Sequence, residues 1–377
     1  MTDSRGADAP GEHLNERAPL LLHSLAELAS IWQPLFELAG VKTAIEVGSE
    51  AGFNTLPLAR WLRGRGGGLT VVDPDPTDEV AAAAQDGELT AVRGLSPQAL
   101  TDIPEADAYL LDGDHNYATL LSELETVFGP GAAPLVILHD VGWPWARRDL
   151  YYAPESLEAQ KRHPYSYDLG VAPGRTDAFD GGFRGEGEFA VALTEGGPHN
   201  GVRTAVEDFV SVYDGFEFQI VPSVFGLGIL YRSDAPYAEA VGAALEPYAG
   251  NPLLDRLERN RIELYLKVLE LQDVLADRDA ALERGRADLG AVHEQWQREV
   301  AERDADLATS RGTEAQMRRL FDSRESERSA RELALLAQVA DLQTALAQAE
   351  RERDEARAAA AAPAPSRLRE ALGRLRG

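Results

Sequence analysis

Short apolar runs alternate with amphipathic stretches along the first 140 residues of the chain. Five runs are rich in leucine and β-branched residues, and the segments between them carry apolar residues at helical spacing. This alternation is typical of parallel strands joined by helices. The pattern predicts strands over 43–48, 69–73, 89–92, 108–112 and 135–139, and helices over 20–40, 53–62, 78–85, 97–100 and 117–128.

Three later segments complete the pattern. A helix is expected over 202–212, and two strands, 217–221 and 226–231, are joined by a short turn that predicts a hairpin at the sheet edge. The expected fold class is therefore α/β: a doubly wound, Rossmann-like, mostly parallel sheet with a closing hairpin. Such sheets bind ligands beyond the carboxyl ends of their strands, so the residues at strand ends are the candidates for chemistry.

The last third of the chain has apolar residues at heptad spacing, which predicts supercoiled helices. Two arginines, Arg261 and Arg278, interrupt the pattern, and charges with Gly312 nearby occupy the seam over 303–331. We expect the rod to be broken or loosely paired there. The alternatives are a solvated helix and a tail that forms a homo-oligomer or docks on a partner protein. The apolar positions are Leu257, Leu264, Val268, Leu271, Leu275, Leu282 and Leu289, and later Leu335, Val339, Leu342 and Leu346.

Composition changes near residue 251, because most glycines, prolines and aromatic residues precede it. We expect a flexible N-terminus over 1–18 and a folded domain over 19–250 with an insertion at 142–201. A coiled coil should follow over 251–357 and then, over 358–377, an Ala/Pro linker with a short basic helix. A frayed C-terminus is the alternative for the last segment.

Charge and cysteine content narrow the classes of function. The 377 residues carry a formal charge of −26, so nucleic acid and anionic membrane surfaces are poor partners. There is no cysteine, which excludes disulfides, thiolate metal sites and cysteine nucleophiles. The N-terminus lacks the order of a signal peptide and no apolar run is long enough for a membrane span, so the expectation is a cytoplasmic protein.

Acidic residues and glycines follow the first two predicted strands. The first strand runs into Glu46-Val-Gly48-Ser49-Glu50-Ala-Gly52, and the second ends at Asp73. Glycines allow a tight turn against a ligand, whereas the carboxylates would repel a diphosphate and attract a cation. A strand-end aspartate can bind both ribose hydroxyls, or it can simply form a turn. The pattern favours a cationic nucleoside over a dinucleotide.

The next three strand ends carry further polar residues. After the third strand, Ser96 in Gly94-Leu-Ser96 could cap the next helix or lie near an adenine ring, with capping favoured. The fourth ends in Asp112-Gly-Asp-His115-Asn-Tyr117 and the fifth in His139-Asp140. Carboxylates and imidazoles that gather at neighbouring strand ends indicate chemistry rather than packing.

Taken in this order, the motifs from about 40 to 232 resemble those of class I S-adenosylmethionine-dependent methyltransferases. The Asp112 block and Gly201-Val-Arg-Thr-Ala-Val-Glu-Asp-Phe209 are similar to the branch of bacterial sugar and natural-product O-methyltransferases, with cephalosporin-hydroxylase-like proteins as relatives. The resemblance implies that S-adenosylmethionine is the cofactor, with Asp73 at the ribose and Ser96 near the adenine. The residues implied at the methionine end are Glu46, Gly48, Ser49 and Gly52, with Asp112 completing the set.

Metal-assisted relatives imply a second set of roles. Asp112 and Asp140 match two of their magnesium ligands, and Val141 stands where they have an asparagine. His139 could supply the missing ligand, so the ion is magnesium or a softer one such as manganese. His115 occupies the position of their general base, and imidazole suits removal of a hydroxyl proton at neutral pH. His115 could instead only orient Asp112, and His139 could be a packed histidine.

The insertion at 142–201 is too long for a simple connection and is expected to be an acceptor-binding lid. Its aromatic residues and arginines, among them Arg147 and Arg148, would stack on a ring or sugar and grip an anionic group. We therefore expect methyl transfer to a hydroxyl of a small acceptor such as a sugar, nucleotide sugar, glycolipid or natural product. The alternatives are a metal-dependent hydroxylase-like enzyme on the same fold and a non-catalytic scaffold. The remaining aromatic and histidine positions are Trp143, Trp145, Tyr151, Tyr152, His163, Tyr165 and Tyr167.

Overall fold

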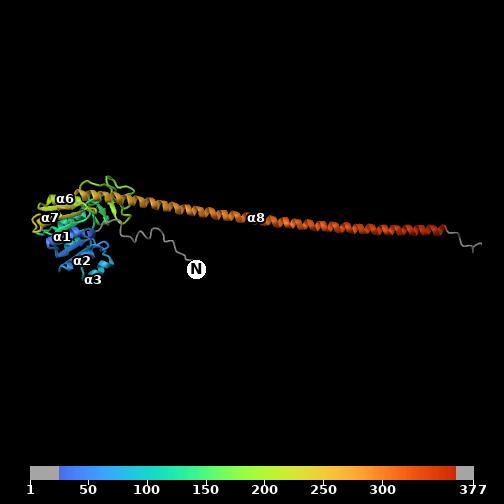
Figure 1. The fold of residues 1–377 in the computed structure, drawn as a ribbon, viewed down its shortest axis with the longest axis horizontal. Helices are drawn as coiled ribbons and strands as arrows, with labels where there is room; N and C mark the ends of the chain where they lie inside the picture. Colours follow the sequence, from blue (N-terminus) through green and yellow to red (C-terminus); the bar gives the residue numbers. More distant parts are fainter. Residues whose placement is uncertain (1–24, 362–377) are drawn as a thin grey trace, which may run out of the picture. The chain divides into compact units, whose positions relative to one another are not determined.

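The computed structural model describes residues 25–361. The segments predicted for 1–18 and for the basic C-terminal helix after the linker lie outside the described residues, as do the first residues of the helix expected over 20–40. The elements run along the chain as alternating strands and helices, followed by the helix α8 (Figure 1).

A seven-stranded sheet, in the order β3-β2-β1-β4-β5-β10-β9, organises the first part of the chain. Neighbouring strands from β3 to β5 are parallel, while β10 pairs antiparallel with both β5 and β9. The strand order therefore reverses between β1 and β4, and the doubly wound sheet and closing hairpin expected from the sequence are confirmed. The strands are β1 Thr43–Val47, β2 Gly68–Asp73, β3 Thr90–Arg93, β4 Ala108–Leu111, β5 Leu135–Leu138, β9 Phe216–Val221 and β10 Leu227–Arg232.

Helices pack on both faces of this sheet because alternate strand residues point to opposite faces. In β5, Leu135 and Ile137 belong to one apolar cluster and Val136 and Leu138 to the other. The first cluster includes residues of α1, α2, α3 and α7, and the second includes residues of α4, α5 and α6. The helices are α1 Ala29–Ala39, α2 Thr55–Arg63, α3 Asp78–Gln85, α4 Gln98–Thr101, α5 Tyr117–Val127, α6 Val202–Val212 and α7 Ala238–Leu245, preceded by the 3-10 helix η1 Leu25–Leu28.

The insertion forms a small sheet of its own, which the sequence pattern did not predict. Its strands are β6 Leu150–Tyr151, β7 Tyr165–Ser166 and β8 Ala190–Ala192, in the antiparallel order β6-β8-β7, with short 3-10 helices at Pro154–Ser156 and Ala159–Lys161. The buried Asp149 ties the insertion to the main sheet, since it accepts hydrogen bonds from the backbone of Tyr117 at 2.8 Å and Gly201 at 2.7 Å. One buried carboxylate of the insertion thus binds the first residue of α5 and the residue before α6.

The long helix α8 runs from Pro252 to Ala361. Asn251 caps it by accepting hydrogen bonds from the backbone of Leu253 and Leu254, and Pro252 suits a first helical position. The helix is unbroken over 303–331, so the expected break in the rod is wrong. A single glycine such as Gly312 costs a helix only about 1 kcal/mol, and charges at a seam disturb pairing rather than helix formation. Whether α8 pairs with another helix stays a prediction.

The chain divides into two compact units between Arg278 and Asp279, inside α8. Residues 254–273 of α8 include partly buried side chains, whereas every residue from 274 to 360 is exposed. The first turns of α8 therefore pack as part of the sheet domain. Among the described residues, no helix has the length and apolar character needed to cross a membrane.

Candidate functional site

A cavity of about 900 Å³ opens beyond the carboxyl ends of β1, β2, β4 and β5. This is the place where the strand order reverses, as expected for a ligand site in a doubly wound sheet. Most of the candidate residues line it: Glu46, Gly48, Ser49, Asp73, Ser96, Asp112, His115, His139 and Asp140. Gly52 does not, although it shapes the turn by donating its N–H to the Ser49 carbonyl at 2.6 Å.

The turn after β1 is built on Gly48 and Asp73. Gly48 has a φ of +85°, and a Cβ there would lie 2.3 Å from the carbonyl oxygen of Asp112, so only glycine fits. One oxygen of Asp73 accepts hydrogen bonds from both the N–H and the hydroxyl of Ser49, each at 2.7 Å. Asp73 therefore fixes the first turn as well as offering a carboxylate to the cavity.

Glu46 is a buried acid with one oxygen lacking a partner. Its Oε1 accepts a hydrogen bond from the Asn54 amide at 2.7 Å, while Oε2 has no hydrogen-bond partner among the described residues. Burial raises the pKa of Glu46 to about 7, and the Asn54 amide and nearby Thr55 hydroxyl offset only part of that rise. Glu46 also lines the cavity, so its carboxylate offers a negative charge to a cation bound there.

Ser96 differs from its expected capping role. Helix α4 has Pro97 at its N-cap and no side-chain cap, and the Ser96 hydroxyl donates instead to the buried Glu123. Burial raises the pKa of Glu123 to about 8. The favoured capping interpretation is wrong because the chain turns at Pro97 and directs the hydroxyl toward α5.

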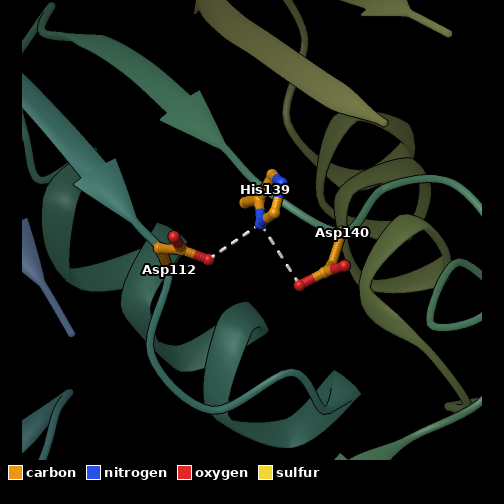
Figure 2. Close-up of side chains that lie close together, drawn as sticks. All are labelled: Asp112, His139 and Asp140. Carbon is orange, nitrogen blue, oxygen red and sulfur yellow. Dashed lines mark hydrogen bonds and ion pairs between the residues drawn. The ribbon is translucent and has the colours of Figure 1, made fainter. Parts of the chain in front are cut away.

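Asp112, His139 and Asp140 form a compact cluster of possible metal ligands (Figure 2). Their ligand atoms all lie within 4.8 Å of one another. His139 Nδ1 is 3.1 Å from Asp112 Oδ1 and 3.4 Å from Asp140 Oδ2. The arrangement comes from the ends of two neighbouring strands, β4 and β5, so it is fixed by the sheet.

The orientation of His139 explains why its Nδ1 faces two carboxylates. Its Nε2 donates to the backbone carbonyl of Val224 at 3.1 Å. In the neutral ring this leaves a lone pair on Nδ1, which would be repelled by both carboxylates unless a proton or a metal ion lies between them. Burial lowers the pKa of His139, but Asp112 and Asp140 outweigh burial and hold it well above its usual range. The cluster thus favours a bound cation.

His115 lies beside the same cluster. Its Nε2 is 3.3 Å from Asp140 Oδ2 and 4.0 Å from Asp112 Oδ1. The ring is largely buried, and its centroid lies 6.3 Å from that of Tyr152. It therefore stands where the carboxylate cluster meets the aromatic residues of the cavity.

Aromatic side chains line the other half of the cavity, and we call them the aromatic wall. Phe183 is central: its ring centroid lies 5.7 Å from Trp145, 6.0 Å from Phe189 and 6.0 Å from Phe225. Such spacings are favourable for aromatic pairs, and flat apolar ligands stack well on such surfaces. The members of the wall are Trp145, Tyr152, Phe183, Phe189, Phe225 and Tyr265.

The two arginines expected to grip an anion are occupied elsewhere. Arg148 is buried and donates to the carbonyls of Ala192 and Thr176, and Arg147 pairs with Glu207 at 2.7 Å. Neither lines the cavity. Their role is to hold the insertion together, so this expectation is wrong. Of the other expected lid residues, Trp145 and Tyr152 do line the cavity.

Acidic side chains outnumber basic ones along the cavity. Among the described residues that line it, seven are acidic and one, Lys161, is basic. The acidic residues are Glu46, Glu50, Asp73, Asp112, Asp114, Asp140 and Glu188.

Several lining residues were missed by the sequence analysis. Phe183 and Phe189 lie among the glycines of the insertion, Phe225 lies in the hairpin turn, and Tyr265 comes from α8. A possible signal for Tyr265 was its position off the heptad seam, in a segment otherwise interpreted as a rod.

Comparisons with known proteins give only distant similarity. No family model and no curated protein matches the chain. It is similar to an S-adenosylhomocysteine-bound methyltransferase of Podospora anserina, with 12% identity over 59% of this chain and 86% of that chain and a TM-score of 0.34. A putative O-methyltransferase from Klebsiella pneumoniae has 17% identity over 59% and 93%, with a TM-score of 0.34.

A third similar structure is an O-methyltransferase from neocarzinostatin biosynthesis, in complex with S-adenosylmethionine and a naphthoic acid. Its identity is 13% over 55% of each chain, with a TM-score of 0.30.

Proposed function

We propose that the protein transfers the methyl group of S-adenosylmethionine to a hydroxyl of a neutral small molecule that has a flat apolar face. The observation that carries this proposal is the composition of one cavity. A buried carboxylate with an unpartnered oxygen lines it near the β1 turn, and a carboxylate-imidazole cluster lies beside an aromatic wall in the same space.

The residues around the first turn suit S-adenosylmethionine. The Glu46 carboxylate would pair with the cationic methionine end, and Asp73 stands at the end of the neighbouring strand, where a ribose would lie. Ser96 and Leu95 line the cavity beyond the third strand. When bound, this cofactor supplies a methyl group activated by the positive charge on sulfur.

Asp112, Asp140 and His139 Nδ1 would hold a divalent cation. Two carboxylate oxygens and one imidazole nitrogen suit manganese better than magnesium, which prefers oxygen ligands alone. Held by these residues, a cation would lower the pKa of a bound hydroxyl.

His115 is positioned to take the proton of the acceptor hydroxyl. Its Nε2 lies 3.3 Å from Asp140 Oδ2, and the ring lines the same cavity as the aromatic wall. As the oxygen–carbon bond forms, the carbon–sulfur bond breaks, and the hydroxyl proton passes to the imidazole ring of His115. The main contribution of these residues is to orient the two reactants in the cavity.

The lining charges narrow the acceptor class. Among the described residues that line the cavity there is no arginine and one lysine, Lys161, so the diphosphate of a nucleotide sugar would find few cationic side chains there. A neutral ring or sugar can stack on the aromatic wall and present a hydroxyl to the carboxylate cluster. We therefore favour a neutral natural product or glycoside over a nucleotide sugar.

The test is release of S-adenosylhomocysteine by the full chain with S-adenosylmethionine, Mn²⁺ and a panel of neutral acceptors, including a dihydroxynaphthalene and a methyl glucoside. We expect turnover with at least one neutral acceptor and loss of turnover with a chelator. No product from any acceptor, in a protein that does bind S-adenosylmethionine, would favour a binding scaffold.

The donor set also favours a second candidate, because two carboxylates and one histidine could hold iron in a hydroxylase-like enzyme. Oxygen consumption that depends on Fe²⁺ and an acceptor, without release of S-adenosylhomocysteine, would support that candidate and contradict methyl transfer.

We further propose that α8 pairs with the same helix of a second copy. Its heptad leucines are exposed, and the tail from residue 251 carries 22 basic and 25 acidic residues, so two tails do not repel strongly. In analytical ultracentrifugation we expect the wild type to be a dimer and the double variant Leu282→Glu/Leu289→Glu to be a monomer. Ala280→Glu/Ala287→Glu, on the opposite side of the heptad, should leave the dimer intact; a monomeric wild type would contradict the proposal.

A further inference from the structure

The first turns of α8 have two different faces. The leucines at 257, 264 and 271 are exposed, whereas Glu258, Ile262, Tyr265 and Asp273 are partly or fully buried. At 100° per residue the mean directions of the two sets lie about 140° apart around the helix axis. The exposed leucines continue the heptad pattern, and the buried set packs on the sheet domain.

Glu258 and Arg261 hold the turn between β9 and β10. The N–H of Phe225 donates to Glu258 Oε1 at 2.8 Å, and Arg261 donates two hydrogen bonds of 2.6 Å to the same carboxylate. The Arg261 guanidinium also lies 4.5 Å from the centre of the Phe225 ring. Glu258 thus connects α8 to the backbone of this turn.

That turn needs external support because of its backbone conformation. Val224 has a φ of 44° and Phe225 a φ of 63°, which is the left-handed region that side chains disfavour, most of all a β-branched one. The turn carries two groups of the site: the Val224 carbonyl holds His139 Nε2, and the Phe225 ring belongs to the aromatic wall. Loosening it would disturb both halves of the acceptor site.

Tyr265 reaches the cavity from the same face of α8. It lines the cavity, and its ring centroid lies 5.7 Å from that of Phe183, the central member of the aromatic wall. Two turns further on, Asp273 accepts a hydrogen bond of 2.5 Å from Arg184, the residue after Phe183. The helix therefore contacts two consecutive residues of the insertion, Phe183 through Tyr265 and Arg184 through Asp273.

We propose that residues 258–273 of α8 form one wall of the acceptor site, with Tyr265 as a specificity-determining residue and Glu258 as a positioning residue for the Val224–Phe225 turn. The inference rests on the proposed function, in that the cavity half next to Tyr265 takes the acceptor. Under this proposal residues 258–273 of α8 contribute to acceptor binding and do not only connect the sheet domain to the rest of the helix.

Tyr265 is tested with the full chain and a fluorescent dihydroxynaphthalene as the probe, in the presence of Mn²⁺. We expect Tyr265→Ala to raise the Kd of the probe at least fivefold, and Tyr265→Phe, which keeps the ring, to stay within twofold of wild type. Leu264→Ala, on the exposed face, is the matched control and should match wild type. Equal probe affinity in wild type and Tyr265→Ala would overturn the proposal, as would equal losses in Tyr265→Ala and Leu264→Ala.

The role of Glu258 is tested by measuring Mn²⁺ affinity. A general loss of packing in α8 would not lower Mn²⁺ affinity while leaving affinity for S-adenosylmethionine unchanged. We expect Glu258→Ala to weaken Mn²⁺ binding about tenfold and Glu258→Gln, which keeps an oxygen for the Phe225 N–H, to recover most of it. Unchanged Mn²⁺ affinity in both variants would contradict the positioning role. If Glu258→Ala does not fold, a smaller loss in Glu258→Gln, with an unchanged Tm, supports the role and its absence contradicts it.

Affinity for S-adenosylmethionine separates this inference from the proposed function. We expect every α8 variant to bind it within twofold of wild type, because its half of the cavity lies at the β1 turn. A wild type that does not bind S-adenosylmethionine contradicts the proposed function alone, while the probe comparison between Tyr265→Ala and wild type still decides the role of α8.

Discussion

The two halves of the cavity are built in different ways. The half at the β1 turn uses residues at the ends of adjacent parallel strands, and its side chains are acidic or small: Glu46, Gly48, Ser49 and Asp73. The aromatic wall draws its members from the insertion, a hairpin turn and α8. Under the proposed function, the sheet supplies fixed positions for the cofactor, while segments outside the sheet supply a surface that can differ with the acceptor.

The cluster of Asp112, His139 and Asp140 has His115 beside it, and the largest effect is expected at His115. His115→Gln should lower turnover about 10²- to 10⁴-fold near pH 7, because the acceptor proton loses its base. Affinity for S-adenosylmethionine should stay within twofold. The deficit should shrink as pH rises toward the pKa of the acceptor hydroxyl, measured as rates of S-adenosylhomocysteine release.

His163 serves as the control for this change, since it lies outside the cavity and its ring contacts the His199 carbonyl. His163→Gln should retain the wild-type rate. A His115→Gln deficit that stays constant with pH would argue for a purely orienting role of His115.

Affinity for S-adenosylmethionine, which we place in the half of the cavity at the β1 turn, should depend on pH, whereas affinity for the acceptor at the aromatic wall should not. A cation binds the ionised form of Glu46, whose pKa is about 7 because of burial. Affinity for S-adenosylmethionine should therefore rise about tenfold between pH 6 and pH 8 and then level off. Glu46→Gln should weaken binding and remove this rise, as measured by calorimetry at several pH values.

Glu50→Gln is the matched comparison, because Glu50 lines the same cavity but is exposed. It should keep the pH dependence. The same dependence in Glu46→Gln would show that another group is responsible.

Burial of Glu46 also predicts the effect of pH on stability. Its pKa is raised in the folded state, so the folded protein binds more protons and loses stability as pH rises from about 4.5 to about 7. At 1.36 kcal/mol per pKa unit, the cost above pH 7 is about 3 kcal/mol. Without ligand, Glu46→Gln should be more stable than wild type at pH 8 and nearly equal to it at pH 4.5, measured by urea unfolding.

The smallest effect is expected in the aromatic wall, where one member of several is lost. Phe189→Ala should raise KM for a neutral aromatic acceptor three- to tenfold and leave affinity for S-adenosylmethionine unchanged. Phe179→Ala, in the same insertion but outside the cavity, is the control. Weaker cofactor binding in Phe189→Ala would contradict the separation of the two halves.

The sequence predicted the parts of the site that depend on local order. Parallel strand ends meet at one edge, so Asp73, Asp112 and His139 could be brought together by counting strands. The separate fates of Arg147 and Arg148 could not be predicted, because a buried arginine that binds backbone carbonyls has the same sequence signature as one that binds a ligand. Tyr265 was hidden because one helix carries both a heptad pattern and a second, domain-facing side.

The most direct test of the central claim is calorimetry of the full chain with S-adenosylmethionine, comparing wild type, Asp73→Asn and Asp75→Asn. Asp75 is the matched control, since its side chain is 92% exposed and it lies two residues away. We predict micromolar binding by wild type and Asp75→Asn, and binding at least tenfold weaker in Asp73→Asn. No binding by wild type, or equal binding by Asp73→Asn, would contradict the account.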